Sequence, residues 1–178
     1  GVAQLFSTDT AFAALKDDGS VVTWGLSSLG GDSSSVAGDL QGGVSQIFAT
    51  EGAFAALKDD GSVITWGSSL RGGDSSSVSP DLQSGVSQIF STYEAFAALR
   101  DDGSVITWGD SRRGGDSSSV ASQLRSGVVS FADPFQDDRL VFESTSSDPS
   151  PPLNLTIDTV APVFTSSNTA GTIDENSG

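Results

Sequence analysis

Three short β-strands are predicted from the pattern of side chains in residues 43–84. The stretch from Val44 to Thr50 alternates with a period of two and is rich in β-forming residues. Two further apolar runs follow, from Ala53 to Lys58 and from Ser62 to Trp66. The Asp-Asp-Gly between them suits a three-residue hairpin loop, so we expect the second and third strands to pair as a hairpin.

The segment after the third strand lacks this alternation. A Gly-Gly pair marks a turn, Asp74 is placed to cap a helix, and Val78 and Leu82 share one helical face at spacing i, i+4. The pattern predicts a short helix or helical turn, whose length Pro80 limits.

The second predicted strand is crowded with small side chains. Ala53, Ala55 and Ala56 leave little volume there, so something bulky should pack closely against the strand. Phe54 and Trp66 are the candidates, either within the unit or across to the next one.

The sequence of this unit is repeated along the chain. "AFAALKDDGSVITWG" at 53–67 has near-identical copies at 11–25 and 95–109, and the units begin at Gly1, Gly43 and Gly85, 42 residues apart. A fixed period of this length is typical of solenoids, propellers and arrays, whose units bury their apolar faces only by stacking.

The apolar strand "VSQIF", the Asp-Gly turn, the Trp-Gly and the Gly-rich "RGGDSS" resemble the repeat of the regulator of chromosome condensation family. The resemblance implies a β-propeller and a role as exchange factor, enzyme inhibitor or protein-binding platform. Ala11, Ala53 and Ala95 replace the family's usual His, and the period is shorter than the family's. The resemblance therefore extends to the scaffold and not to an activity.

The expected fold class is mainly β, with three strands and a short helical turn in each unit. Three units cannot close a propeller, which takes typically 4 to 8 blades, so we expect a partial β-propeller or an open repeat stack. Further copies before Gly1 are the preferred interpretation, and the first unit should present an uncovered face.

Composition excludes several functions. The 178 residues carry 8 Lys and Arg against 23 Asp and Glu, a net charge of −15, and no basic stripe that could bind nucleic acid. The absence of Cys and His removes zinc sites of the usual kind and Ser-His-Asp or Cys-His catalysis. No apolar run approaches the roughly 20 residues of a membrane span. High acidity with abundant small polar residues favours an extracellular or cell-surface protein of bacterial origin.

The remainder of the chain departs from the repeat. We expect an array over 1–142, made of units 1–42, 43–84 and 85–126 and a degenerate capping unit at 127–142. A Ser/Pro-rich linker follows at 143–157. The words "APVF" and "DENSG" in 158–178 resemble the start of a bacterial cadherin-like or immunoglobulin-like domain.

Calcium is the metal that this resemblance implies. In cadherins the Glu of such a Glu-Asn pair, here Glu175, ligates calcium, and Asp158 is the second candidate ligand. The alternative is that both are solvated acids. The Asp-Gly motifs of the repeats are interpreted as turns and caps, since they lack alternating carboxylates at ligand spacing.

Differences among the near-identical units indicate where a partner could bind, because repeat proteins keep their scaffold and vary their loops. The candidate partner-binding residues are Leu70, Arg71, Tyr93, Arg112 and Arg113. Neutral drift of exposed loops is the alternative.

Three functions follow. The first is a non-catalytic module of a large secreted or cell-surface protein that binds a protein or cell-surface ligand or mediates adhesion. The second is a spacer stiffened by calcium. A carboxylate hydrolase, which needs two acids about 5 to 9.5 Å apart, has little support because the recurrent acids lie in turns.

Overall fold

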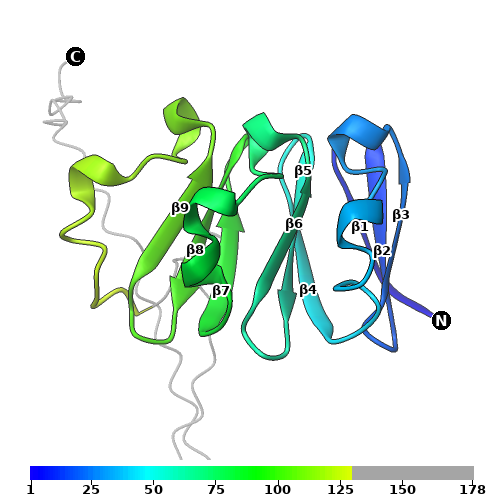
Figure 1. The fold of residues 1–178 in the computed structure, drawn as a ribbon, viewed down its shortest axis with the longest axis horizontal. Helices are drawn as coiled ribbons and strands as arrows, with labels where there is room; N and C mark the ends of the chain where they lie inside the picture. The colour runs from blue at the N-terminus through cyan, green and yellow to red at the C-terminus, as the bar shows by residue number, and fades with distance from the viewer. Residues whose placement is uncertain (130–178) are drawn as a thin grey trace, which may run out of the picture. The chain divides into compact units, whose positions relative to one another are not determined.

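The computed structural model of the chain describes residues 1–129 (Figure 1). The capping unit at 127–142 lies outside the described residues from position 130 onward. The linker at 143–157 and the cadherin-like segment at 158–178 lie wholly outside them.

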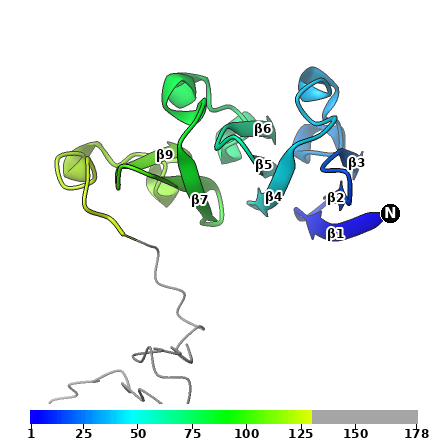
Figure 2. The ribbon, with the colours of Figure 1, turned by 90° about the horizontal axis from the view of Figure 1, so that it is seen from below.

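Each unit forms one three-stranded antiparallel sheet in which the strands follow sequence order. The mainly β fold class is confirmed, and the three sheets stand in tandem without closing into a barrel over residues 1–129 (Figures 1 and 2). The strands are β1 (Val2–Ser7), β2 (Ala11–Lys16), β3 (Val21–Gly25), β4 (Val44–Ala49), β5 (Ala53–Lys58), β6 (Val63–Gly67), β7 (Val86–Ser91), β8 (Ala95–Arg100) and β9 (Val105–Gly109).

Two short 3-10 helices follow each sheet, where the sequence predicted one helical turn. They are η1 (Ser27–Leu29), η2 (Ser34–Val36), η3 (Ser69–Arg71), η4 (Ser76–Leu82), η5 (Ser111–Arg113) and η6 (Ser118–Val120). The predicted turn corresponds to η4, which contains Pro80, and Asp74 Oδ1 accepts a hydrogen bond from the backbone N–H of Ser76 at 2.9 Å. The additional helix η3 ends at Gly72, whose φ of +94° turns the chain back.

The Asp-Asp-Gly loop closes the β5–β6 hairpin, as the sequence predicts. Gly61 has φ +75° and donates to the Lys58 carbonyl at 2.9 Å. Asp60 Oδ1 accepts hydrogen bonds from the backbone N–H of Ser62 at 2.9 Å and from its hydroxyl at 2.6 Å. The carboxylate of Asp60 is therefore part of the turn, in agreement with the structural interpretation of this motif.

Neighbouring sheets pack through the aromatic pair and the alanines. Phe54 stacks on Trp66 with ring centroids 5.2 Å apart, and both are buried in a cluster with Ala11 and Ala13 of the preceding sheet. The Trp66 indole N–H donates to the Gly30 carbonyl of that sheet's loop at 3.1 Å. The bulky partner of the alanines thus comes from the next unit.

The same contact recurs between the second and third sheets. Phe96 and Trp108 pack against Ala53 and Ala55, and the Trp108 N–H donates to the Gly72 carbonyl at 3.0 Å.

No helix in residues 1–129 is long and apolar enough to cross a membrane.

Candidate functional site

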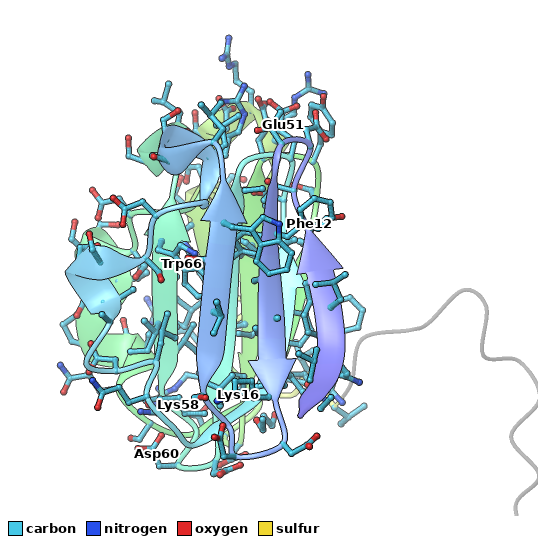
Figure 3. The ribbon with its side chains drawn as sticks, turned by 90° about the vertical axis from the view of Figure 1, so that its right-hand side faces the viewer. Phe12, Lys16, Glu51, Lys58, Asp60 and Trp66 are labelled. Atoms are coloured by element: carbon cyan, nitrogen blue, oxygen red, sulfur yellow. The ribbon has the colours of Figure 1, made fainter. Side chains whose placement is uncertain are left out.

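The predicted partner-binding residues gather at one end of the strands. They lie on the β7–β8 loop and on η3 and η5. Figure 3 shows Glu51, on the β4–β5 loop, at this end of the sheets, and Lys16, Lys58 and Asp60 near the hairpin turns at the opposite end. We call the end that carries Glu51 the rim.

A loop threonine, buried in the first two units and exposed in the third, positions the first short helix of each unit beside that unit's own loop. The Thr50 hydroxyl donates to the Arg71 carbonyl at 2.9 Å and accepts from the backbone N–H of Ala53 at 3.0 Å. Thr92 makes the equivalent bond to the Arg113 carbonyl at 2.8 Å. Each arginine is therefore held next to the loop that precedes it.

Backbone hydrogen bonds join the loops of successive units. The Asp9 N–H donates to the Glu51 carbonyl at 2.9 Å, and the Glu51 N–H donates to the Tyr93 carbonyl at 3.0 Å. The three loops therefore form one continuous row along the rim.

Five side chains meet on this row, and we call them the rim cluster: Glu51, Arg71, Tyr93, Glu94 and Arg113. Arg71 pairs with Glu51, and its Nε lies 3.6 Å from Glu94 Oε1. Arg113 Nε lies 3.3 Å from Glu94 Oε2. The two arginines and two glutamates thus alternate in charge across the boundary between the second and third units.

Tyr93 completes the cluster. The guanidinium carbon of Arg113 lies 5.9 Å from the centre of the Tyr93 ring, within the range of a cation–π contact. The Tyr93 hydroxyl hydrogen-bonds to the Glu51 carboxylate, and this bond raises the pKa of Tyr93 and lowers the pKa of Glu51.

The carboxylates lie deeper than the cations. The side chains of Glu51 and Glu94 are 11% and 20% exposed, whereas that of Arg113 is 57% exposed and Tyr93 is 58% exposed. Glutamates therefore anchor the cluster, and Tyr93 and Arg113 face the solvent.

Leu70 and Arg112 stand apart from the cluster, on the solvent side of η3 and η5. Leu70 is 73% exposed. Arg112 pairs with Asp110 at 3.2 Å, and Asp110 also accepts from the backbone N–H of Arg112, which lowers the pKa of Asp110. The structure thus joins three of the five predicted residues and leaves these two exposed beside them.

Sequence reasoning missed Glu51 and Glu94. Both fall at the variable pairs 51–52 and 93–94 in the loops, which was the available signal. The sequence pattern alone places these acids in turns or in solvent, because no local spacing connects them with the arginines about 20 positions later in the unit.

The predicted calcium ligands Asp158 and Glu175 lie outside the described residues. Within residues 1–129, no three or more His, Cys, Asp or Glu side chains gather to hold a metal ion.

No family model and no curated protein matches the chain. Among solved structures, human WBSCR16 is 25% identical over 65% of this chain and 37% of its own length, with a TM-score of 0.43. The ectodomain of the Physcomitrella patens receptor kinase CR4 is 17% identical over 65% of this chain and 31% of its own length, with a TM-score of 0.44. Yeast RCC1 (Prp20), solved with Kap60, is 18% identical over 61% of this chain and 30% of its own length, with a TM-score of 0.43. The chain spans about a third of the length of these proteins.

Proposed function

We propose that the repeat array is a non-catalytic protein-binding module that contacts its partner through the rim. The observation that carries this proposal is the location of the differences between units. The second and third units differ at ten positions. Four of them, 51, 52, 68 and 70 against 93, 94, 110 and 112, lie in or beside the loop and the first short helix that form the rim, four lie in or beside η4, and only two lie in strands.

The exposed rim has the chemistry of a protein interface. Tyr93, Leu70 and Arg112 present an aromatic ring, an aliphatic side chain and a guanidinium to solvent. Tyrosine and arginine are enriched in such interfaces and supply much of their binding energy.

The rim cluster also prepares two exposed side chains, Tyr93 and Arg113, for binding. The hydrogen bond from Tyr93 to Glu51 and the ion pair between Arg113 and Glu94 restrict both side chains before a partner arrives. Less side-chain entropy is then lost on association.

Charge indicates the kind of partner. Within the rim cluster, the two negative charges of Glu51 and Glu94 neutralise the two positive charges of Arg71 and Arg113. A partner of the rim therefore does not have to carry a strong charge. The net charge of −15 repels polyanions. A folded protein with its own polar and apolar groups fits this surface best.

We place the module in a secreted or cell-surface protein with an adhesive role, on the support of its acidic, Cys-free composition. Antibodies raised against the chain should label intact cells of the source organism. Labelling only after the cells are made permeable would contradict this location.

The binding role is tested by comparing which extracellular proteins bind to three immobilised forms of the chain. These are the wild type, the rim variant Leu70→Ser/Tyr93→Ser/Arg112→Ser, and the control Asp59→Ser/Asp101→Ser, whose substitutions lie at the end of the strands opposite the rim. All changed side chains are exposed, so each variant should keep the wild-type circular dichroism spectrum.

We expect at least one extracellular protein to bind wild type and control and to bind the rim variant at least tenfold more weakly by calorimetry. A rim variant that retains every ligand of the wild type would overturn the assignment of the rim.

A further inference from the structure

The first sheet exposes the face that the other two sheets bury. Phe12 and Trp24 stack with centroids 5.4 Å apart, as Phe54 and Trp66 do at 5.2 Å. Trp24 is nevertheless 45% exposed, against 2% for Trp66. Figure 3 looks onto this open side, with Phe12 labelled on it. We call it the head face, defined by Phe12, Val22 and Trp24.

The head face lacks one specific partner. Trp66 and Trp108 each donate their indole N–H to a glycine carbonyl of the preceding unit, Gly30 and Gly72. The Trp24 indole makes no such hydrogen bond within residues 1–129, and it is 45% exposed. The face is therefore arranged for a glycine turn of the same kind.

The corresponding turn of the third unit has no following sheet packed on it among residues 1–129. Gly114 has φ +106°, like Gly30 at +102°, but it is exposed where Gly30 and Gly72 are buried. A Cβ at Gly30 would lie 2.6 Å from Phe54 Cδ2, whereas a Cβ at Gly114 would meet Thr92 Cγ2 at 3.9 Å among the described residues.

The surroundings of Gly114 match those of the earlier glycines. Val120 is 42% exposed and Leu124 is half-buried, while Leu82, the counterpart of Leu124, is 2% exposed beneath the next sheet. We call this surface the tail face, defined by Gly114, Val120 and Leu124.

We propose that the head face of one copy of this chain binds the tail face of a second copy. The contact repeats the internal interface that the chain forms twice, with the Trp24 indole donating to the Gly114 carbonyl. Both halves of a working interface are thus carried by one chain, and the inference stands independently of the rim.

The geometry of such a contact determines how many copies assemble and whether they form a closed ring. A head-to-tail interface is heterologous, and it forms a ring where the rotation closes. Two copies supply six units, which lies within the typical 4 to 8 blades of a propeller. We expect a closed dimer of the 18.1 kDa chain.

The test uses the full chain and one charged substitution on each face. Val22 and Val120 are 53% and 42% exposed, so Val22→Glu and Val120→Glu should leave the monomer folded, as thermal unfolding would check. Their counterparts Ile64 and Val78 pack in the internal interfaces.

Sedimentation equilibrium should show a dimer for the wild type and a monomer for each variant alone. An equimolar mixture of the two variants should dimerise, because the intact tail face of Val22→Glu meets the intact head face of Val120→Glu. Acrylamide should quench tryptophan fluorescence less in the wild-type dimer than in Val120→Glu.

Two results would overturn the proposal. A wild-type chain that stays monomeric at about 1 mM, where even a millimolar Kd would leave a large share paired, has no such contact. Self-association of Val120→Glu equal to that of the wild type would show that the tail face takes no part.

Discussion

Glu51 links two units through a single side chain. Its carboxylate pairs with Arg71 of its own unit and hydrogen-bonds to Tyr93 of the next. At 11% exposure it is largely removed from water, so these contacts replace its hydration. The orientation of the exposed Tyr93 ring therefore depends on Glu51.

Replacing Glu51→Gln should lower the pKa of Tyr93 toward its ordinary value of about 10. The carboxylate stabilises the neutral phenol, which donates to it, and repels the phenolate. Because Tyr93 is the one tyrosine among the 178 residues, an ultraviolet absorbance titration measures it directly.

Glu94→Gln is the matched control for this measurement. Glu94 acts on Tyr93 only through its charge and ranks below Glu51 among the causes, so the fall in the pKa should be smaller. An unchanged pKa in Glu51→Gln would show that the hydrogen bond does not form in solution.

Between elements, a glycine turn and an aromatic pair join one sheet to the next. Gly72 ends η3 with its carbonyl toward Trp108 and its Cα against Phe96. This approach excludes a side chain at Gly72. A Cβ at Gly73 would instead lie 2.5 Å from the backbone of Gly67, so the two glycines of the pair are required for different reasons.

Gly72→Ala should destabilise the protein by about 2 to 5 kcal/mol. The positive φ costs a side chain about 1 to 2 kcal/mol, and a Cβ placed 2.6 Å from Phe96 Cδ2 adds an overpacking cost of about 1 to 3 kcal/mol. Urea unfolding at a dilute concentration, where the chain is monomeric, measures the loss.

Gly114→Ala separates the cost of backbone strain from the cost of overpacking. Gly114 has a similar positive φ, but a Cβ there would have no contact closer than 3.9 Å among residues 1–129. It should lose only the strain, about 1 to 2 kcal/mol. Equal losses in the two variants would mean that close packing against Phe96 contributes nothing.

At the scale of the whole molecule, acid should destabilise the array. In every unit two aspartates accept hydrogen bonds from a serine two positions later, which lowers their pKa values. These aspartates are Asp18, Asp32, Asp60, Asp74, Asp102 and Asp116. The folded state therefore binds protons less readily than the unfolded chain.

A carboxyl whose folded pKa is depressed contributes stability above its unfolded pKa, about 3.9 for Asp, and loses it as pH falls through the folded value. The urea midpoint should thus be nearly constant from about pH 5 to 8, where no His titrates, and should fall below about pH 4. Ser20→Ala/Ser62→Ala/Ser104→Ala should show a weaker decline. A midpoint independent of pH down to about 2 would contradict this account.

Much of the local structure was predictable, because contiguous residues encode it. The strands from Val44 and from Ala53 begin where the pattern predicts. The helical segment proved harder: the Gly-Gly turn admits a second 3-10 helix at Ser69–Arg71, which carries no apolar periodicity. Of the candidate site, sequence variation indicated the loops but not the acids that pair with their arginines.

By itself the sequence determined the 42-residue repeat, its three strands and its Asp-Gly hairpins, since their hydrogen bonds join residues a few positions apart. Only the tertiary structure decided what joins the units: Trp66 with a carbonyl 36 residues earlier, and Arg71 with acids from two loops. Such pairs depend on how far apart and at what angle the sheets stack, and no single unit contains that information.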